Sequence, residues 1–389
     1  MVNAFSLVTG GDPFAWIPSM RAQGPVVNFG AGPWFVLGYD ACVAALRDHA
    51  SFSSAIMGRM GQGGERRGFG LTMLGSDPPE HTRLRTLVSY AFTPRRIAAL
   101  EPRIRSIADE LLDEVVPEGS FDLMPAFAEP LPVTIIAEML GIPTADRREF
   151  KRWSDAVVSF TDGERSGERA NGDTRGAMEE ITAYLRRQLE LRRSRPTDDL
   201  IGALIAAESA GGDHLSPEEA LATCVLLLIA GNETTTNLIG NAVVALNDHG
   251  LLVEVAADPA LIAGAVEETL RHQPPVLSIV RNTVREVELG GRTIPAGAIA
   301  LVVLAAANRD RNVFPDPERF DIRRNPNRNI AFGLGIHFCL GAPLARLEAR
   351  IALEVLLRRC TGLHRAETGP VERMPSMILY GPKRLPVAC

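Results

Sequence analysis

A ten-residue segment near the C-terminus carries the residue types best suited to chemistry. It reads Phe332-Gly333-Leu334-Gly335-Ile336-His337-Phe338-Cys339-Leu340-Gly341. A cysteine thiolate keeps its charge beside a cationic metal and backbone N–H donors. Glycines let a backbone turn closely around the sulfur, because they adopt φ values that other residues avoid. A lone cysteine is more often a small buried hydrophobic residue. The glycines and His337 around Cys339 instead favour a thiolate that ligates a metal.

A helix is predicted to begin just after this cysteine. Ala342-Pro343 suits a first turn, and the apolar pattern continues to Arg358. Such a helix points its positive N-terminal end at the sulfur, which favours the thiolate form. The remaining cysteines show neither zinc spacing nor a disulfide framework; they are Cys42, Cys224, Cys360 and Cys389. Cys339 is therefore the candidate metal ligand.

A second polar segment interrupts a long apolar helix. That helix begins at Ser216-Pro217-Glu218-Glu219, which contains a capping box, and its pattern runs to about Asn247. Midway lies Ala230-Gly231-Asn232-Glu233-Thr234-Thr235, in which the glycine and the threonines weaken the helix. The Thr234 hydroxyl can bond the carbonyl four residues earlier and widen the turn. The segment is either a functional acid–alcohol pair or a satisfied kink in a core helix.

Two pairs of polar residues have helical spacing. Glu268 and Arg271 lie three apart, and His81 and Arg85 lie four apart, so each pair shares one helix face. Alone, either spacing is typical of an exposed pair that contributes little to stability. The segment Pro317-Glu318-Arg319-Phe320 follows the first pair.

Helical periodicity dominates the rest of the chain. Helices are predicted at residues 39–49, 80–92, 95–115, 177–193, 217–247, 259–272 and 342–358. Strands are predicted at residues 26–29 and 34–37, around a hairpin turn, and at residues 299–304. The sequence therefore predicts a mainly α fold with a small β-rich portion, in a single domain over residues 1–389.

Taken together, these segments resemble the cytochrome P450 family. Residues 332–341 match its haem-binding loop, F-G-x-G-x-H-x-C-x-G, at every specified position. Residues 230–234 match its oxygen-activation motif, A-G-x-[DE]-T, with Glu233 at the acid position. The E-x-x-R pair and residues 317–320, which resemble the family's meander motif, occur in the family's order. The resemblance covers essentially the whole chain and implies the cytochrome P450 fold.

The resemblance implies a haem b cofactor whose iron is ligated by Cys339. Thiolate ligation donates electron density that favours O–O cleavage. The other residues implied to bind the cofactor are His81, Arg85, Ala230, Arg281, Phe332, Gly333, His337 and Gly341. The basic residues among them are implied to bind the haem propionates, which are carboxylates that need cationic or N–H donors.

The implied activity is that of an O2-dependent monooxygenase. Glu233 and Thr234 are implied to handle protons during oxygen activation, whereas Glu268, Arg271 and Arg319 are implied to form a buried structural network. The expected reaction is hydroxylation or epoxidation of a lipophilic small molecule in secondary metabolism. Two alternatives remain: a peroxygenase that uses H2O2 directly, and a haem-binding or sensor protein without catalysis. The intact acid–threonine pair favours the monooxygenase.

The substrate pocket is expected to be mainly apolar. Its predicted lining residues are Leu226, Ile229, Val276, Leu277, Ile279, Ile378 and Leu379. The segment 57–73, with Met57, Met60 and Met73, resembles the family's variable lid, and methionines suit an adaptable apolar surface. Ordinary core packing is the alternative for each of these residues.

Electrons are expected from a ferredoxin and a ferredoxin reductase, since no flavin or iron–sulfur module is visible in the sequence. Arg95, Arg96 and Arg346 are predicted to complement an acidic ferredoxin. The net charge of −6 gives no basic footprint for nucleic acid. No signal-peptide pattern is present, and the apolar run at residues 298–307 is far shorter than the ~20 residues of a membrane span. We therefore expect a cytoplasmic monomer that binds neither nucleic acid nor membrane.

Overall fold

The computed structural model describes residues 13–30, 32–55, 68–147, 149–150, 152–153, 172–208, 212–373 and 376–389. The chain divides into two compact units. The first contains the described parts of residues 1–54, 108–128 and 234–389, and the second contains those of residues 55–107 and 129–233. Each unit thus combines stretches that are far apart in the sequence. The single domain over residues 1–389 stays a prediction.

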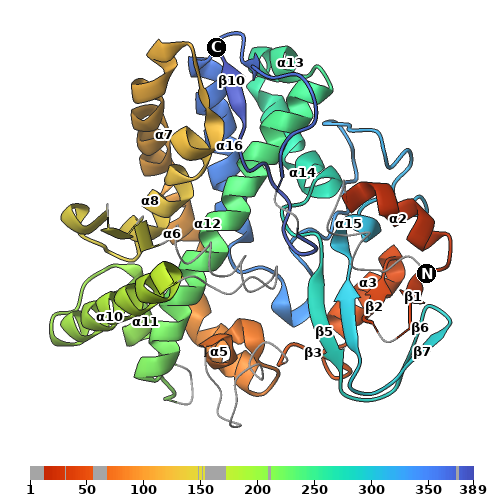
Figure 1. The fold of residues 1–389 in the computed structure, drawn as a ribbon. Coiled ribbons are helices and arrows are strands. Elements are labelled where there is room, and N and C mark those ends of the chain that lie inside the picture. Colours follow the sequence, from red (N-terminus) through yellow and green to blue (C-terminus); the bar gives the residue numbers. More distant parts are fainter. Residues whose placement is uncertain are drawn as a thin grey trace. The chain divides into compact units, whose positions relative to one another are not determined.

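The first unit is mainly helical. Its α-helices are α2 (Pro13–Arg21), α3 (Tyr39–Arg47), α13 (Leu252–Ala257), α14 (Ile262–His272), α15 (Leu304–Ala307) and α16 (Ala342–Arg359) (Figure 1). Shorter turns are the 3₁₀-helices η3 (Val116–Glu118), η6 (Pro259–Leu261) and η7 (Gly335–His337), and the π-helix η4 (Met124–Ala128). The chain passes between the units within two longer helices, α7 (Glu101–Val115) and α12 (Pro217–Asp248).

The first unit also contains the β-rich portion. Its five-stranded sheet has the order β1 (Val26–Asn28), β2 (Trp34–Val36), β8 (Ile299–Val302), β5 (Ile279–Thr283) and β3 (Phe52–Ser53). The predicted hairpin is confirmed, because β1 and β2 pair antiparallel. A three-stranded sheet has the order β4 (Ser120–Asp122), β10 (Pro386–Ala388) and β9 (His364–Arg365), and a two-stranded sheet joins β6 (Val287–Leu289) to β7 (Arg292–Ile294).

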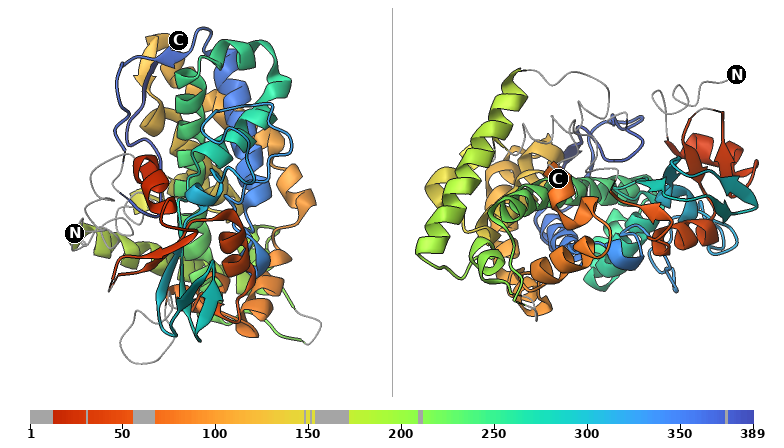
Figure 2. Two further views of the ribbon diagram at one scale, coloured as in Figure 1. Left: turned by 90° about the vertical axis from the view of Figure 1, so that its right-hand side faces the viewer. Right: turned by 90° about the horizontal axis from the view of Figure 1, so that it is seen from below.

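Two apolar clusters cover opposite faces of the five-stranded sheet. Successive side chains of a strand point to opposite faces. Accordingly Val36 and Val302 pack with Cys42 of α3 in one cluster. Phe35, the neighbour of Val36, packs with Trp16 of α2 in the other. The sheet is therefore held between α2 and α3 (Figure 2).

The second unit contains the remaining described helices. Its α-helices are α5 (Glu80–Ser89), α6 (Pro94–Ala98), α8 (Pro130–Met139), α10 (Gly172–Ser194) and α11 (Leu200–Ala206), and its 3₁₀-helices are η1 (Gly68–Leu71), η2 (Met73–Gly75) and η5 (Thr144–Asp146). Helix α10 is seen along its length in Figure 2 (right). It is fastened to α11 by Arg192, whose Nε donates to Oδ2 of Asp199 at 2.7 Å. Asp199 also caps α11, since its Oδ1 accepts from the backbone N–H of Gly202.

Helix α12 has the start that the sequence predicts. The backbone N–H of Ser216 donates to Oε2 of Glu219 at 2.8 Å, and the Glu219 N–H donates to Oγ of Ser216 at 3.2 Å. These two bonds form the capping box. The helix then continues as α-helix to Asp248, through residues 230–235 as well. The widened turn that Thr234 was expected to open is therefore absent.

The predicted helix over residues 95–115 is two helices. Helix α6 ends at Ala98 and α7 begins at Glu101. Pro102 explains the break, because proline has no N–H and clashes with the carbonyl four residues earlier when a helix continues through it. Thr93 caps the first piece, since its hydroxyl oxygen accepts from the Arg96 N–H at 3.3 Å. The apolar periodicity of the sequence continues through these residues, but the helix itself is interrupted at the proline.

The cysteine spacing shows no disulfide framework, but the structure contains a disulfide. Cys360, just after α16, is bonded to Cys389, just after β10, and their Cα atoms lie 4.7 Å apart. The pairing of β10 with β9 brings the two cysteines together, which the sequence spacing does not reveal. Within the described ranges, no helix combines the length and the apolar character that a bilayer crossing requires.

Candidate active site

The loop before α16 turns back on itself around Cys339. The backbone N–H of Cys339 donates to the carbonyl of Phe332 at 2.9 Å, which closes the loop. Gly333 and Gly335 have φ values of +69° and +71°, in the left-handed region that favours glycine. A Cβ atom at Gly335 would lie 2.7 Å from the carbonyl oxygen of Leu46 in α3. The glycines therefore allow both the turn and its close approach to α3.

Helix α16 starts beside the sulfur atom. Gly341 is its N-cap and Pro343 lies in its first turn, as the sequence predicts. The Ala342 N–H lies 3.4 Å from the carbonyl oxygen of Cys339, and a Cβ atom at Gly341 would come within 4.0 Å of Cys339 Sγ. The helix of 18 residues thus presents its positive end at the thiol, where it favours a negative charge.

The described thiols outside the disulfide differ in exposure. Cys42 and Cys224 are completely buried, and burial raises the pKa of both thiols, that of Cys224 to about 12. Both therefore stay protonated near neutral pH. Cys339 is partly exposed and lies at a helix start. A thiolate ligand needs such access and such a field, so the residues present fit a thiolate-bound metal cofactor.

Strand β5 lies beside the loop. A Cβ atom at Gly333 would lie 3.6 Å from Cδ1 of Ile279, so the Ile279 side chain contacts the loop. Arg281, two residues on, shares this face of the strand, is 4% exposed and donates from Nη1 to the Val280 carbonyl at 2.8 Å. His337 of the loop hydrogen-bonds through Nε2 to Oγ of Ser54 at 3.0 Å. The first unit thus brings Cys339, His337, Ile279 and Arg281 into one region.

The first unit also brings together the predicted pocket residues near the C-terminus. Val276 and Leu379 form an antiparallel bridge, and the Leu277 N–H donates to the Ile378 carbonyl at 2.7 Å. The side chain of Leu277, however, packs in the cluster that contains Trp16. Its assignment to the pocket therefore rests on the resemblance alone. Of the expected lid, Met57 and Met60 lie outside the described residues, and Met73 begins η2.

Other predicted residues lie in the second unit. His81 and Arg85 are one turn apart on α5, with His81 2% exposed and Arg85 half-buried. Leu226 and Ile229 are buried on α12, whereas Ala230 is exposed. Arg83 ties α5 to the start of α12, because its guanidinium pairs with both Glu80 and Glu219.

The acid–threonine pair lies where the chain passes from the second unit into the first. Glu233 is the last residue of the second unit's segment, Thr234 is the first of the following segment, and both are half-buried. The next two residues, Thr235 and Thr236, are buried. The Thr236 hydroxyl donates to the Ala128 carbonyl at 3.0 Å. The part of α12 after Thr234 is therefore anchored within the first unit.

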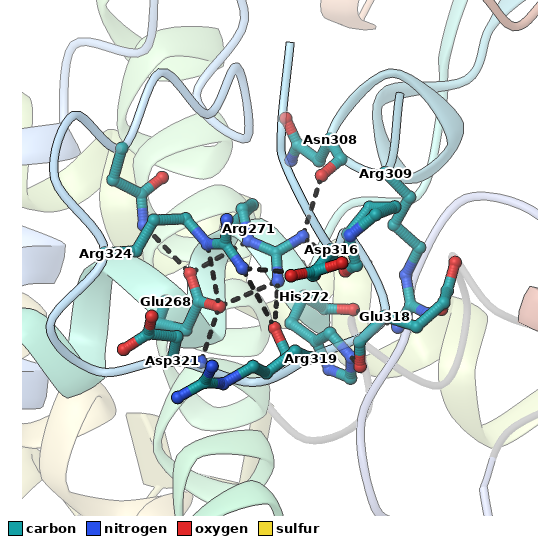
Figure 3. Close-up of polar contacts among 12 residues, drawn as sticks. Glu268, Arg271, His272, Asn308, Arg309, Asp316, Glu318, Arg319, Asp321 and Arg324 are labelled. Carbon is teal, nitrogen blue, oxygen red and sulfur yellow. Dashed lines mark hydrogen bonds and ion pairs between the residues drawn. The ribbon is translucent and has the colours of Figure 1, made fainter. Parts of the chain in front are cut away.

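The predicted Glu268–Arg271 network is present and completely buried (Figure 3). Arg271 donates from Nη2 and Nε to the two carboxylate oxygens of Glu268, at 2.7 and 2.8 Å. Its guanidinium also donates to three backbone carbonyls, those of Asn308, Pro317 and Arg319. Such a bidentate, fully bonded pair can persist in the interior.

The third member of this network is Arg324, and the assignment of the Arg319 side chain to it is wrong. Arg324 Nε donates to Oε1 of Glu268 at 3.2 Å, and Nη1 donates to the Pro315 carbonyl at 2.8 Å. The Arg319 side chain is exposed, and only its carbonyl joins the network. Phe320 occupies the interior position beside His272, with ring centroids 5.6 Å apart, so the preceding side chain points to solvent. Sequence reasoning stopped at the motif and missed Arg324.

Two of the arginines predicted to receive a ferredoxin are engaged within the chain. Arg346 pairs with Glu267, at 2.5 Å from Nε to Oε1, and its guanidinium lies 4.5 Å from the centre of the Phe332 ring. Arg96 pairs with Asp198 at 2.7 Å. Arg95 is exposed. Arg346 therefore supports the thiolate loop by contacting Phe332.

Sequence reasoning also missed Glu348. This glutamate lies on α16, is 3% exposed and has the Thr235 side chain as a hydrogen-bond partner. Burial raises its pKa to about 8, because the charged form loses its hydration; the bond from Thr235 offsets this only in part. The sequence did contain a signal for this residue: an acidic residue at an apolar position of the helical pattern in α16.

Comparisons with known proteins identify the family of the chain. The sequence profile of the family described as "Cytochrome P450" matches residues 21–250 and 260–387. Cytochrome P450 monooxygenase PikC of Streptomyces venezuelae is 43% identical over 386 residues, which cover 97% of this chain and 91% of the relative. Cyclomarin C epoxidase CymV of Salinispora arenicola is 39% identical, over 99% of this chain and 98% of the relative.

A solved structure has the same fold. CYP109E1 from Bacillus megaterium, in complex with testosterone, matches with a TM-score of 0.87 at 37% sequence identity, covering 97% of this chain and 99% of that one. The predicted fold is thus confirmed. Because the family profile and these relatives extend over nearly all of its length, the chain belongs to the cytochrome P450 family, among the monooxygenases.

Proposed function

We propose that the chain is an O2-dependent haem-thiolate monooxygenase that inserts one oxygen atom into a lipophilic small molecule, with Cys339 as the iron ligand. The observation that carries this proposal is the setting of Cys339: a partly exposed thiol, in a loop closed by its own N–H, at the start of α16. A thiolate is stabilised there by the helix end.

The cofactor is proposed to be haem b, which when bound supplies the activation of O2 and the transfer of an oxygen atom. In the first unit, we assign His337 and Arg281 to the propionates, with Phe332, Gly333 and Gly341 shaping the loop. In the second unit, we assign His81 and Arg85 to the propionates and Ala230 to the cofactor's surroundings. Cationic and N–H donors neutralise the two carboxylates of the propionates.

Glu233 and Thr234 are proposed to be the catalytic pair. The Glu233 carboxyl takes up and releases protons, and the Thr234 hydroxyl donates a hydrogen bond and accepts another, so the pair can hold a proton and pass it on. Both are half-buried within an apolar helix. Leu226 and Ile229, on the preceding turns of the same helix, are buried and apolar.

The substrate is proposed to be lipophilic, a product or intermediate of secondary metabolism. Support comes from the apolar residues Val276, Ile279, Ile378 and Leu379, which the first unit places close to one another or to the thiolate loop. It also comes from the relatives, of which one is an epoxidase of cyclomarin C and another binds testosterone. Hydroxylation and epoxidation are both compatible with these features.

The electrons are proposed to come from a ferredoxin and its reductase. Phe338, next to the thiolate, is 39% exposed, and an exposed aromatic residue suits a protein interface. Arg95 is exposed as well and can attract an acidic partner.

The proposal is tested first by the spectrum of the reduced, CO-bound protein. Wild type is expected to show the red-shifted Soret band of a thiolate-ligated haem, and Cys339→Ala is expected to lose it. Cys224→Ala, which removes a fully buried thiol, is the matched control and should keep the band. A Cys339→Ala variant with an unchanged band would overturn the assignment.

A second experiment separates the monooxygenase from a peroxygenase and from a sensor. Lipophilic compounds, with testosterone as one probe, are screened for spectral shifts of the ferric protein. A compound that binds is then incubated with O2, ferredoxin and reductase, or with H2O2 alone. Product in the first incubation supports the proposal. Product only with H2O2 identifies a peroxygenase, and no product from any bound compound favours a sensor.

A further inference from the structure

Glu348 occupies a position where the helix pattern demands an apolar residue. On α16, Leu344, Glu348, Ile351 and Val355 follow helical spacing along one face, and all four are buried. Carboxylates are almost never fully buried unless they are paired with a cation. Within the described residues no cation offsets the burial of Glu348; its polar partner is Thr235. The carboxyl is therefore held as the neutral acid at neutral pH.

The contact joins two helices that matter for the chemistry. Helix α16 begins just after Cys339, so it is continuous with the thiolate loop. Helix α12 carries Glu233 and Thr234, and Thr235 is the next residue. Thr235 and Glu348 both belong to the first unit and are each 3% exposed. A buried hydrogen bond between neutral groups is strong in this apolar setting, and leaving one partner unpaired is costly.

Other polar contacts hold the same part of α12. The Thr236 hydroxyl bonds the carbonyl at the end of η4, and Asn241 Nδ2 donates to the carbonyls of Gln273 and Tyr380, at 3.0 and 2.8 Å. These anchors lead to the η4 segment, to the end of α14 and to the C-terminal segment. Of the contacts described here, the bond between Thr235 and Glu348 is the one that connects α12 to α16, the helix that follows the thiolate. It therefore fixes the position of Thr234 relative to that helix.

We propose that Glu348 is a positioning residue for the oxygen-activation segment: through its buried contact with Thr235, it fixes the part of α12 after Thr234 against the helix that begins at the thiolate loop. The inference rests on the proposed function, since it assumes that Thr234 acts on the cofactor held by Cys339. In this role Glu348 acts through Thr235, its hydrogen-bond partner.

The test compares Glu348→Gln, Glu348→Leu, Thr235→Val and the double variant Thr235→Val/Glu348→Leu as holoenzymes. Glutamine keeps the size and the hydrogen bond but cannot ionise, whereas leucine removes both polar functions. Two quantities are measured. The first is the C–O stretching band of the reduced CO complex, which reports the surroundings of the bound CO. The second is the ratio of product formed to reductant consumed. Glu354→Gln is the matched control, because Glu354 lies on the same helix and pairs with Arg350 instead.

Thr235→Val and Glu348→Leu are each expected to shift or broaden the C–O band and to lower the product ratio by at least about twofold, the lower end of couplings between contacting residues. The double variant should match either single variant, and Glu348→Gln and Glu354→Gln should resemble wild type. In wild type the band should also change as pH rises past about 8, and it should not in Glu348→Gln.

Additive effects of the two single changes would overturn the inference. An unchanged band and product ratio in Thr235→Val would do so too, and this variant tests the inference even where Glu348→Leu does not fold. Failure of the proposed function is distinguishable, because wild type itself would then lack the thiolate-type band. In that case the assumption behind the inference falls, whereas a normal wild-type band with insensitive variants refutes the positioning role alone.

Discussion

At the scale of single residues, the site requires a position without a side chain as well as particular side chains. Gly335 has no side chain where α3 approaches, and its φ of +71° is one that other residues rarely adopt. Cys339 differs from the buried thiols Cys42 and Cys224 only in its surroundings. On the same helix, the Glu354 carboxyl pairs with Arg350, whereas burial keeps the Glu348 carboxyl neutral by raising its pKa.

Gly335→Ala is expected to weaken haem retention. The added methyl group meets the Leu46 carbonyl at 2.7 Å, and the left-handed backbone costs a non-glycine residue about 1–2 kcal/mol. The fraction of protein with the thiolate-type CO band should therefore fall. Gly250→Ala is the control, because Gly250 has a similar φ of +67° with nothing within 4 Å of the added atom. Equal haem retention in the two variants would contradict the role of the close approach.

The pKa of Glu348 predicts a pH dependence of stability. In the unfolded chain the carboxyl titrates near its ordinary value of 4.5, and in the folded chain near 8. Below 4.5 both states are protonated and burial carries no ionisation penalty. Between 4.5 and 8 only the folded state keeps the proton, so the free energy of unfolding falls by roughly 1 kcal/mol per pH unit, and it levels off above 8.

Glu348→Gln should remove this dependence. Denaturant titration from about pH 5 to about pH 9 measures the difference in unfolding free energy between the variant and wild type. This difference should grow in favour of the variant up to about pH 8 and then stay constant. A difference that does not vary with pH would show that the carboxyl is ionised throughout.

At the scale of elements, the sequence predicted most helices and the first hairpin, because periodicity and turn residues are local signals. The capping box at Ser216 placed the start of α12 correctly. Pairings between distant stretches had no such signal: β2 runs parallel to β8, with Trp34 opposite Ala300. The Glu268 network shows the same limit, because Arg324 reaches Glu268 only through the path of the loop that follows the motif.

Arg324→Ala is expected to destabilise the first unit, whereas Arg319→Ala is not. Removing Arg324 leaves the buried Glu268 carboxylate with one fewer donor and takes a donor from three backbone carbonyls, which costs about 3 kcal/mol, as for other broken buried pairs. The exposed Arg319 side chain should be replaceable within about 0.5 kcal/mol. Thermal unfolding of the two variants checks this. A larger effect at Arg319 would restore the assignment made from the motif.

At the scale of the whole molecule, the two units interleave along the chain, and the predicted site residues are distributed over both. The motifs made these residues recognisable, since the family pattern lists them in order. Glu348 and Arg324 could not be found that way, because their roles arise from what packs around them. The disulfide was hidden for a similar reason: Cys360 and Cys389 meet only when β10 pairs with β9.

This disulfide predicts a redox-dependent stability. It closes a loop over a sequence separation of 29 residues and fastens the chain end to the end of α16. Closing a loop of this length restricts the unfolded chain by about 3–4 kcal/mol in the entropic account. Oxidised wild type should therefore unfold at a higher temperature than wild type treated with a reductant. Cys389→Ser, which removes the exposed partner, should match the reduced protein under both conditions. If reductant lowered the unfolding temperature of Cys389→Ser as well, the stabilisation would have to come from another source than this bond.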